Sequence, residues 1–277
     1  MHRYLADIDV AREKKAILVV SFGTSYNENR AKTIGAIENA IAKEFPDWEV
    51  RRAFTSKMII KKLEKRDGEI IDYVDEALGR LIADGFKTVV VQPTHIMNGQ
   101  EHEDIMHVVY TYTDNFDKIV MGRPLLSTEK DYEIAVKAIE KTIVKEAEKM
   151  SQEKTAIVLM GHGTGHYANS AYCELQMKLL LMGFPNIFMT TVEGFPSFED
   201  TLLLMDSRGY KNVILSPFML VAGDHANNDM AGDDEDSLRS VMAKHGYTPF
   251  CIVKGLGEYP EFEKIFVAHV KDVIKNL

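Results

Sequence analysis

Short runs of aliphatic and β-branched residues alternate along the chain with longer segments whose apolar positions recur at helical spacing. This alternation is typical of βα units built on a parallel sheet. It predicts a helix of strong helix formers over Glu129–Lys149 and a closing helix over Glu261–Lys275. It also predicts eight strands, four in each half of the chain: Ala16–Val20, Glu49–Ala53, Thr88–Gln92, Lys118–Met121, Ala156–Met160, Ile187–Val192, Val213–Ser216 and Phe250–Lys254.

The two halves of the chain repeat each other in sequence. Ile17–Thr24 (ILVVSFGT) resembles Ile157–Thr164 (IVLMGHGT) at a displacement of 140 residues, and Gly85–Pro93 (GFKTVVVQP) resembles Gly209–Pro217 (GYKNVILSP) at a displacement of 124. Since the displacement drops by 16, the first half carries an insertion, which falls around the basic stretch Lys57–Arg66. We expect two pseudo-symmetric Rossmann-like α/β domains, residues 1–127 and 128–277. Each has a four-stranded parallel sheet flanked by helices, and the two face each other across a cleft.

At three matched positions beyond the strand ends, the second half carries a metal-binding side chain. Ligands of open parallel sheets bind outside the carboxyl ends of the strands. In the strand order 2-1-3-4, the strand that leads to His162 lies between the strands that lead to Glu193 and His225. We therefore expect the three side chains to converge on one ion. In the changes from first to second half, Phe22 becomes His162, Phe54 becomes Glu193, and Glu101, expected in a loop, becomes His225.

The three candidate ligands indicate the kind of ion. Two imidazole nitrogens and one carboxylate oxygen suit Co²⁺, Ni²⁺, Fe²⁺ or Zn²⁺ better than Mg²⁺ or Ca²⁺. Three protein ligands leave coordination positions open, as in a working site. Each residue alone has a simpler interpretation: His162 caps a helix, Glu193 is a carboxylate at a helix start, and His225 is a surface residue in a polar loop.

Composition excludes several classes of protein. A formal net charge of −9 argues against a nucleic-acid binder. The longest apolar run, Val213–Ala222, is too short for a membrane span, and the first fifteen residues have no secretory apolar core, so we expect a cytoplasmic protein. Cys173 and Cys251 lie far apart and indicate neither a thiolate metal site nor a redox pair.

Six segments, in order along the chain, carry a family resemblance. They resemble the class II tetrapyrrole chelatases, and most closely the anaerobic cobaltochelatases of the CbiK type, from Ile17 to the C-terminal helix. The segments are Ser21–Ser25 (SFGTS), Ala53–Ser56 (AFTS), Gln92–His95 (QPTH), Gly161–Thr164 (GHGT), Val192–Pro196 (VEGFP) and Gly223–Met230 (GDHANNDM).

The resemblance implies a bilobal chelatase fold and insertion of Co²⁺ into sirohydrochlorin on the early-cobalt, anaerobic route to cobalamin. It also implies that the matched His162, Glu193 and His225 are the metal ligands. Metal insertion removes two pyrrole protons while a partly desolvated cation is delivered, so the site needs a base beside a loosely held metal. We expect His162 and Glu193 to be catalytic, with His162 both ligand and proton acceptor, and no cofactor beyond the metal substrate.

Sirohydrochlorin carries many carboxylates, which require local positive groups in an acidic protein. Backbone N–H groups after Phe22 and His162 are one candidate. The basic run Lys57–Arg66 is another, although a solvated helix face is its simpler interpretation. The residues predicted to bind substrate are Ser21, Phe22, Gly23, Thr24, Gly163 and Thr164.

Several alternatives stay open at this point. His95, His102 and His107 could contact a second metal or a haem, or could reflect loop polarity alone. The reaction could use Fe²⁺ or Ni²⁺ with a tetrapyrrole, or precorrin-2 in place of sirohydrochlorin. The protein could also carry a metal or a tetrapyrrole without chemistry, and homo-oligomerisation stays undecided.

Overall fold

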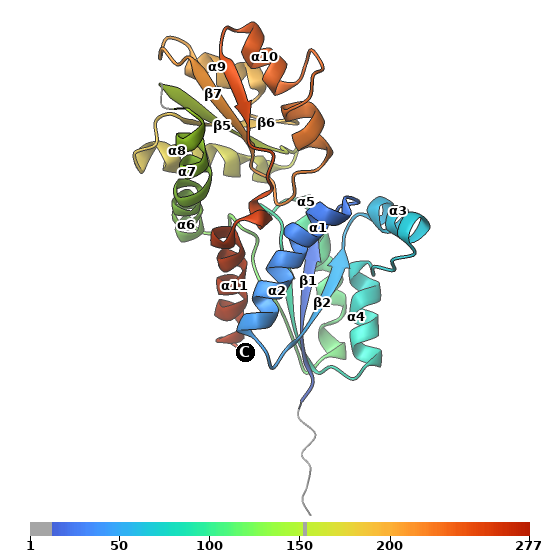
Figure 1. Cartoon of the computed structure of the whole chain (residues 1–277). Coiled ribbons are helices and arrows are strands. Elements are labelled where there is room, and N and C mark those ends of the chain that lie inside the picture. Colours follow the sequence, from blue (N-terminus) through green and yellow to red (C-terminus); the bar gives the residue numbers. More distant parts are fainter. Residues whose placement is uncertain (1–12, 152–153) are drawn as a thin grey trace, which may run out of the picture.

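The computed structural model describes residues 13–151 and 154–277 and has two lobes, each built on a parallel four-stranded sheet (Figure 1). The strand orders, β2-β1-β3-β4 and β6-β5-β7-β8, confirm the predicted fold class. The first sheet consists of β1 (Lys15–Ser21), β2 (Glu49–Phe54), β3 (Thr88–Pro93) and β4 (Lys118–Met121). The second consists of β5 (Thr155–Gly161), β6 (Ile187–Thr191), β7 (Asn212–Pro217) and β8 (Thr248–Cys251).

The central strands are apolar at consecutive positions because helices cover both faces of each sheet. Residues 16–20 of β1 are completely buried, and so are residues 213–215 of β7. The predicted strand Phe250–Lys254 is wrong in position, because β8 begins at Thr248 and includes Pro249. An edge strand tolerates proline because one side of its backbone needs no ladder partner.

Helices connect the strands in both lobes. The predicted helix Glu129–Lys149 is α6 and α7 joined by a π-helical turn, Glu140–Val144, and the closing helix starts one residue earlier than predicted. The helices are α1 (Asn27–Lys32), α2 (Ile34–Glu44), α3 (Lys57–Asp67), α4 (Val74–Ala83), α5 (Gln100–Thr111), α6 (Glu129–Ile139), α7 (Lys145–Met150), α8 (Ser170–Leu181), α9 (Phe198–Met205), α10 (Leu238–Lys244) and α11 (Pro260–Ile274). None of these described helices is long and apolar enough to cross a membrane.

Most of the predicted insertion corresponds to one additional helix between β2 and β3. The second lobe connects β6 to β7 through α9, whereas the first connects β2 to β3 through α3 and then α4. Ser56 caps α3 by accepting a hydrogen bond from the Ile59 backbone at 3.4 Å. Gly68 ends the helix in the left-handed conformation, with φ of 67°.

The chain passes between the lobes twice, after β4 and after β8. The final helix, α11, packs against α2 of the first lobe, so the last residues of segment 128–277 lie on the first lobe (Figure 1). Phe262 and Phe266 on the inner face of α11 are completely buried. The C-terminal helix therefore returns to the lobe in which the chain began.

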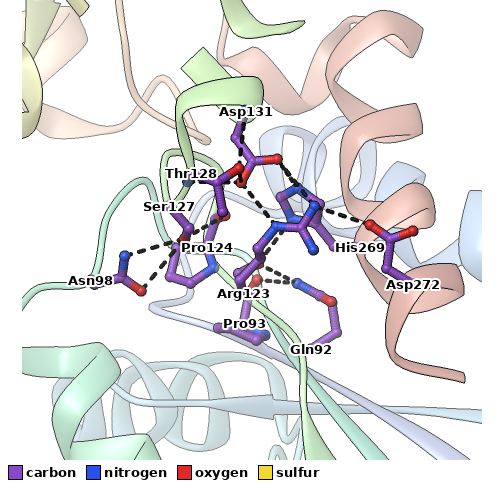
Figure 2. A network of polar contacts seen from close by, with 10 residues as sticks. All are labelled: Gln92, Pro93, Asn98, Arg123, Pro124, Ser127, Thr128, Asp131, His269 and Asp272. Carbon is purple, nitrogen blue, oxygen red and sulfur yellow. Dashed lines mark hydrogen bonds and ion pairs between the residues drawn. The ribbon is translucent and has the colours of Figure 1, made fainter. Parts of the chain in front are cut away.

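A polar network fixes α11 to the crossover after β4 (Figure 2). Completely buried Asp131 accepts hydrogen bonds from Nε and a terminal nitrogen of Arg123 at 2.9 and 3.1 Å. His269 of α11 places Nε2 3.1 Å from Asp131 and Nδ1 3.0 Å from the Arg123 carbonyl oxygen. Although burial opposes ionisation, hydrogen bonds from Arg123 and Thr128 hold the pKa of Asp131 below its ordinary value.

Candidate active site

The repeated turns after β1 and β5 each depend on a glycine. Gly23 and Gly163 have φ values of 100° and 84°, a region that side chains disfavour. A Cβ atom at Gly163 would also lie 1.8 Å from the carbonyl oxygen of Glu193. These turns place Phe22 directly after β1 and His162 directly after β5, which are the equivalent strands of the two sheets.

His162 and His225 come together at the end of the second sheet. Their strands, β5 and β7, are hydrogen-bonded neighbours, and the two ring centroids lie 4.6 Å apart with the rings nearly perpendicular at 88°. Nδ1 of His162 lies 2.9 Å from the carbonyl oxygen of Gly163, which can only accept, so Nδ1 carries the proton. This tautomer leaves the lone pair on Nε2 for a metal or a proton.

The second histidine has a carboxylate partner that the sequence analysis did not assign. Nδ1 of His225 lies 2.8 Å from Oδ2 of Asp229, one turn further along. A carboxylate that accepts a hydrogen bond from one ring nitrogen orients a metal-binding imidazole and makes the other ring nitrogen a better ligand. The spacing of four residues was the available signal, because it brings side chains together on a helical turn.

Glu193 lies beside the histidines through its backbone. Its N–H donates to the carbonyl oxygen of His162 at 2.8 Å, and its side chain is exposed. In the part of the chain that the structure describes, no three His, Cys, Asp or Glu side chains are grouped to hold a metal ion. The structure thus brings two of the three predicted ligands together, and the three-ligand centre stays a prediction.

The pairing of Phe54 with Glu193 across the repeat is wrong by two residues. Phe54 pairs with Ser21 as Thr191 pairs with Gly161, and Phe54 is completely buried. The counterpart of Glu193 is Ser56, whose N–H donates to Phe22 as that of Glu193 donates to His162. The match failed because the first half has three more residues between its first two strands.

The first-lobe histidines gather on or near α5. Glu101, expected in a loop, lies in the first turn of this helix, with Oε2 2.8 Å from Nε2 of His95. Burial lowers the pKa of His102, and the nearby His95 shifts it in the same direction. His107 is exposed on the same helix. The described residues here also form no three-membered metal group.

The loops at the carboxyl ends of the two sheets touch each other. Tyr26, after β1, donates to Asp224 in the loop after β7. In a second contact between such loops, the Tyr167 hydroxyl donates to Glu103 of α5 at 2.6 Å. A pocket of about 240 Å³ lies between the lobes and is lined partly by Met97 and Tyr167. The predicted sites therefore lie at the junction of the lobes.

The first turn presents one predicted substrate-binding side chain to solvent. Ser21 is buried, and its Oγ lies 2.7 Å from Oγ1 of Thr94. Thr24 is also buried and accepts a hydrogen bond from the Tyr26 backbone at 3.2 Å. Phe22, in contrast, is 47% exposed. Of these side chains, Phe22 is the one placed to contact an apolar ligand.

In the second turn, the backbone groups predicted to receive carboxylates have acceptors within the protein. The N–H of Gly163 donates to the Tyr172 hydroxyl at 3.4 Å. The N–H of Thr164 donates to Oδ1 of Asn169 at 3.1 Å. A substrate carboxylate would have to replace these bonds, which makes the second turn a poorer anion site than the sequence suggested.

Curated proteins resemble this chain over nearly its full length. It is 40% identical over 263 residues to the sirohydrochlorin cobaltochelatase of Salmonella typhimurium, covering 94% of this chain and 97% of that protein. It is 31% identical over 266 residues to the sirohydrochlorin cobaltochelatase CbiKC of Nitratidesulfovibrio vulgaris, covering 95% and 92%.

Solved structures share the fold at lower sequence identity. SirB from Bacillus subtilis with Fe³⁺ superposes with a TM-score of 0.66 at 16% identity, covering 95% of this chain and 96% of that chain. CbiX, the terminal enzyme for biosynthesis of sirohaem in denitrifying bacteria, gives a TM-score of 0.55 at 16% identity, covering 93% and 99%. The family model of cobalt chelatase (CbiK) matches residues 15–275. With that match and the 40% identical relative, the chain belongs to the cobalt chelatase (CbiK) family.

Proposed function

We propose that this protein inserts Co²⁺ into sirohydrochlorin and that His162 and His225 hold the ion before transfer. The observation that supports this most is the pairing of their rings at 4.6 Å, with both Nδ1 atoms engaged and both Nε2 atoms left as ligands. The substrates are those in the names of the two relatives, and the similarity over nearly the whole chain supports the same substrates for this protein.

The two histidines have different parts in the proposed reaction. Insertion releases two pyrrole protons. His162 donates only to a neutral carbonyl oxygen, so its Nε2 can release the metal and then accept one of them, while the exposed Glu193 carboxylate accepts the other and passes it to solvent. His225 is held by Asp229 and stays a ligand. Glu193 supplies negative charge that lowers the cost of placing a dication beside the histidines. Such nitrogen and oxygen ligands bind a transition metal without the strong hold of thiolates.

A spectroscopic assay tests this function. Purified protein with excess sirohydrochlorin and Co²⁺ should change the absorption spectrum over many turnovers, faster than the same mixture without protein. A change of one equivalent that then stops would indicate a carrier and contradict the proposal. Parallel assays with Fe²⁺ and Ni²⁺ identify the preferred ion, because this ligand set does not discriminate sharply among them.

A further inference from the structure

We propose that Lys61, Lys62 and Lys65 of α3 bind the carboxylates at the rim of the tetrapyrrole. This inference rests on the proposed function, since it assigns the anion-binding surface for the same substrate.

Helix α3 is not needed to build the repeated fold. The second lobe forms the same four-stranded sheet with one helix, α9, where the first lobe has α3 and α4. The additional helix is also the basic one, with five Lys and Arg residues against two acidic residues, Glu64 and Asp67. An element outside the common framework at a substrate-binding edge is a candidate for a function of its own.

The position of α3 places it beside both candidate turns. The N–H of Ser56, its capping residue, donates to the carbonyl oxygen of Phe22 at 3.2 Å. Leu63 belongs to an apolar cluster that also receives Leu220 and Val221, from the loop between β7 and His225. The helix therefore begins next to Phe22 and shares an apolar cluster with the loop that carries a proposed metal ligand.

The outer face of α3 combines apolar and positive groups. With Leu63 buried, helical spacing turns Met58, Lys61, Lys62 and Lys65 outward together, and Met58 is 75% exposed. Among the described residues, no carboxylate lies within ion-pair distance of these three lysines, whereas Arg66 pairs with Asp67. A flat apolar macrocycle with carboxylates around its rim needs this combination of apolar contact and free positive charge.

Charge is separated between the lobes in a way that suits the two substrates. The loop Gly223–Asp236, around His225, carries six acidic residues and no Lys or Arg. Helix α9, the neighbour of Glu193, has Glu199 and Asp200 and no basic residue. The metal side is thus acidic and attracts a cation, while α3 is the basic element at the same junction. The N–H groups of the second turn already have acceptors within the protein, so α3 is a better anion site than that turn.

The test replaces the three lysines by glutamine together. The matched control is Lys137→Gln/Lys141→Gln/Lys149→Gln. It removes the same charge from three exposed lysines in the helical segment that precedes β5. The α3 variant should raise KM for sirohydrochlorin roughly 5- to 20-fold with a smaller effect on kcat, while KM for Co²⁺ stays near that of wild type. Lys→Arg replacements at the three positions should restore KM.

Salt dependence and metal-free binding complete the test. Wild-type kcat/KM for sirohydrochlorin should fall as salt is raised, because exposed charge pairs are screened, and the α3 variant should respond less. If the α3 variant and the control share one KM and one salt response while cobalt is inserted, the inference is overturned. Tetrapyrrole fluorescence quenching without metal separates the two proposals: binding that needs the lysines but yields no insertion would overturn only the function. A wild-type protein that does not bind sirohydrochlorin would overturn both.

Discussion

His162 and His225 lie with their ring centroids 4.6 Å apart, yet they are held by different partners. A backbone carbonyl oxygen orients His162, and the carboxylate of Asp229 orients His225. The carbonyl adds no charge, so His162 can bind a metal or a proton in turn. The carboxylate favours a ligand that stays on the metal. This difference is the reason why we propose His162, and not His225, as the proton acceptor.

Replacing each histidine by alanine should separate the two roles. His162→Ala removes a ligand and the base together, so turnover should fall by roughly 10²–10⁴-fold at any Co²⁺ concentration. His225→Ala leaves the base in place, so raising Co²⁺ should recover part of the rate. Steady-state kinetics over a range of Co²⁺ concentrations measures both. Near-normal turnover in His162→Ala would show that the chemistry lies on another residue.

Asp229 should affect the affinity for Co²⁺, because its carboxylate holds the ring of His225. Asp229→Ala should raise KM for Co²⁺ about 10- to 100-fold, because the outer hydrogen bond that orients His225 is lost. Asp229→Asn keeps an oxygen acceptor and should restore most of the affinity. Equilibrium binding of Co²⁺ to both variants provides the comparison, and equal affinity in wild type and Asp229→Ala would remove Asp229 from the site.

Residue roles were predictable only where the sequence shows a spacing. The 140-residue displacement places His162 at a strand end, and the spacing of four could have identified Asp229. Side-chain direction is not visible in the sequence, so the exposed position of Glu193 could not be predicted. The pairing of Phe54 with Glu193 failed for a related reason: the segment between the first two strands is three residues longer in the first half, and no motif in the sequence reveals this.

Among the helices and strands, the apolar pattern predicted seven strands at nearly their observed positions and the eighth with shifted bounds, because buried parallel strands are continuously apolar. It could not predict that α11 packs on the first lobe, since an amphipathic helix shows which face is buried but not against what. It also did not reveal the Arg123–Asp131–His269 network, whose members are far apart in sequence.

The turn after β5 should be sensitive to a single methyl group. Gly163→Ala combines a disfavoured φ of 84° with a Cβ atom 1.8 Å from the carbonyl oxygen of Glu193, so that backbone must move. We expect a loss of about 2–4 kcal/mol in the free energy of unfolding and a loss of activity, since His162 and Glu193 flank the clash. Gly165→Ala, with no atom nearby, is the control and should change neither. Urea unfolding measures the stability of both variants. A wild-type midpoint for Gly163→Ala would contradict the predicted clash at this turn.

The buried network should contribute stability in a pH-dependent way. Asp131→Asn removes the charge that faces Arg123 and His269 and should lower the free energy of unfolding by about 2–4 kcal/mol at pH 7. Asp272→Asn, at an exposed carboxylate on the same arginine, should cost less than about 1 kcal/mol.

The folded-state pKa of Asp131 lies below its ordinary value. Its ionised form therefore stabilises the fold above about pH 4, and this contribution is lost as pH falls through the lowered pKa. Urea unfolding at pH 7 and near pH 3 should show the gap between wild type and Asp131→Asn shrinking in acid. A gap independent of pH would contradict the assignment.

For the whole molecule, the two lobes share one framework and differ in what each adds to it. Both have the same sheet and the same glycine turn, while the second carries His162 and His225 in the segments after β5 and β7 and the first carries α3. The contacts of Tyr26 with Asp224 and of Tyr167 with Glu103 join the two sets of loops. Under the two proposals, the cation and the polyanion bind to different lobes and meet at their junction.

The proposed cobalt site can be tested by soaking a crystal of the protein in Co²⁺ and measuring it at the cobalt absorption edge. If the two histidines hold the ion, one strong anomalous peak should lie about 2.0–2.2 Å from Nε2 of both His162 and His225, with the Glu193 carboxylate turned toward it as the third ligand. The same soak of His162→Ala should weaken the peak. A dominant peak at another group, such as His95 and Glu101, or no peak near the histidine pair, would contradict it.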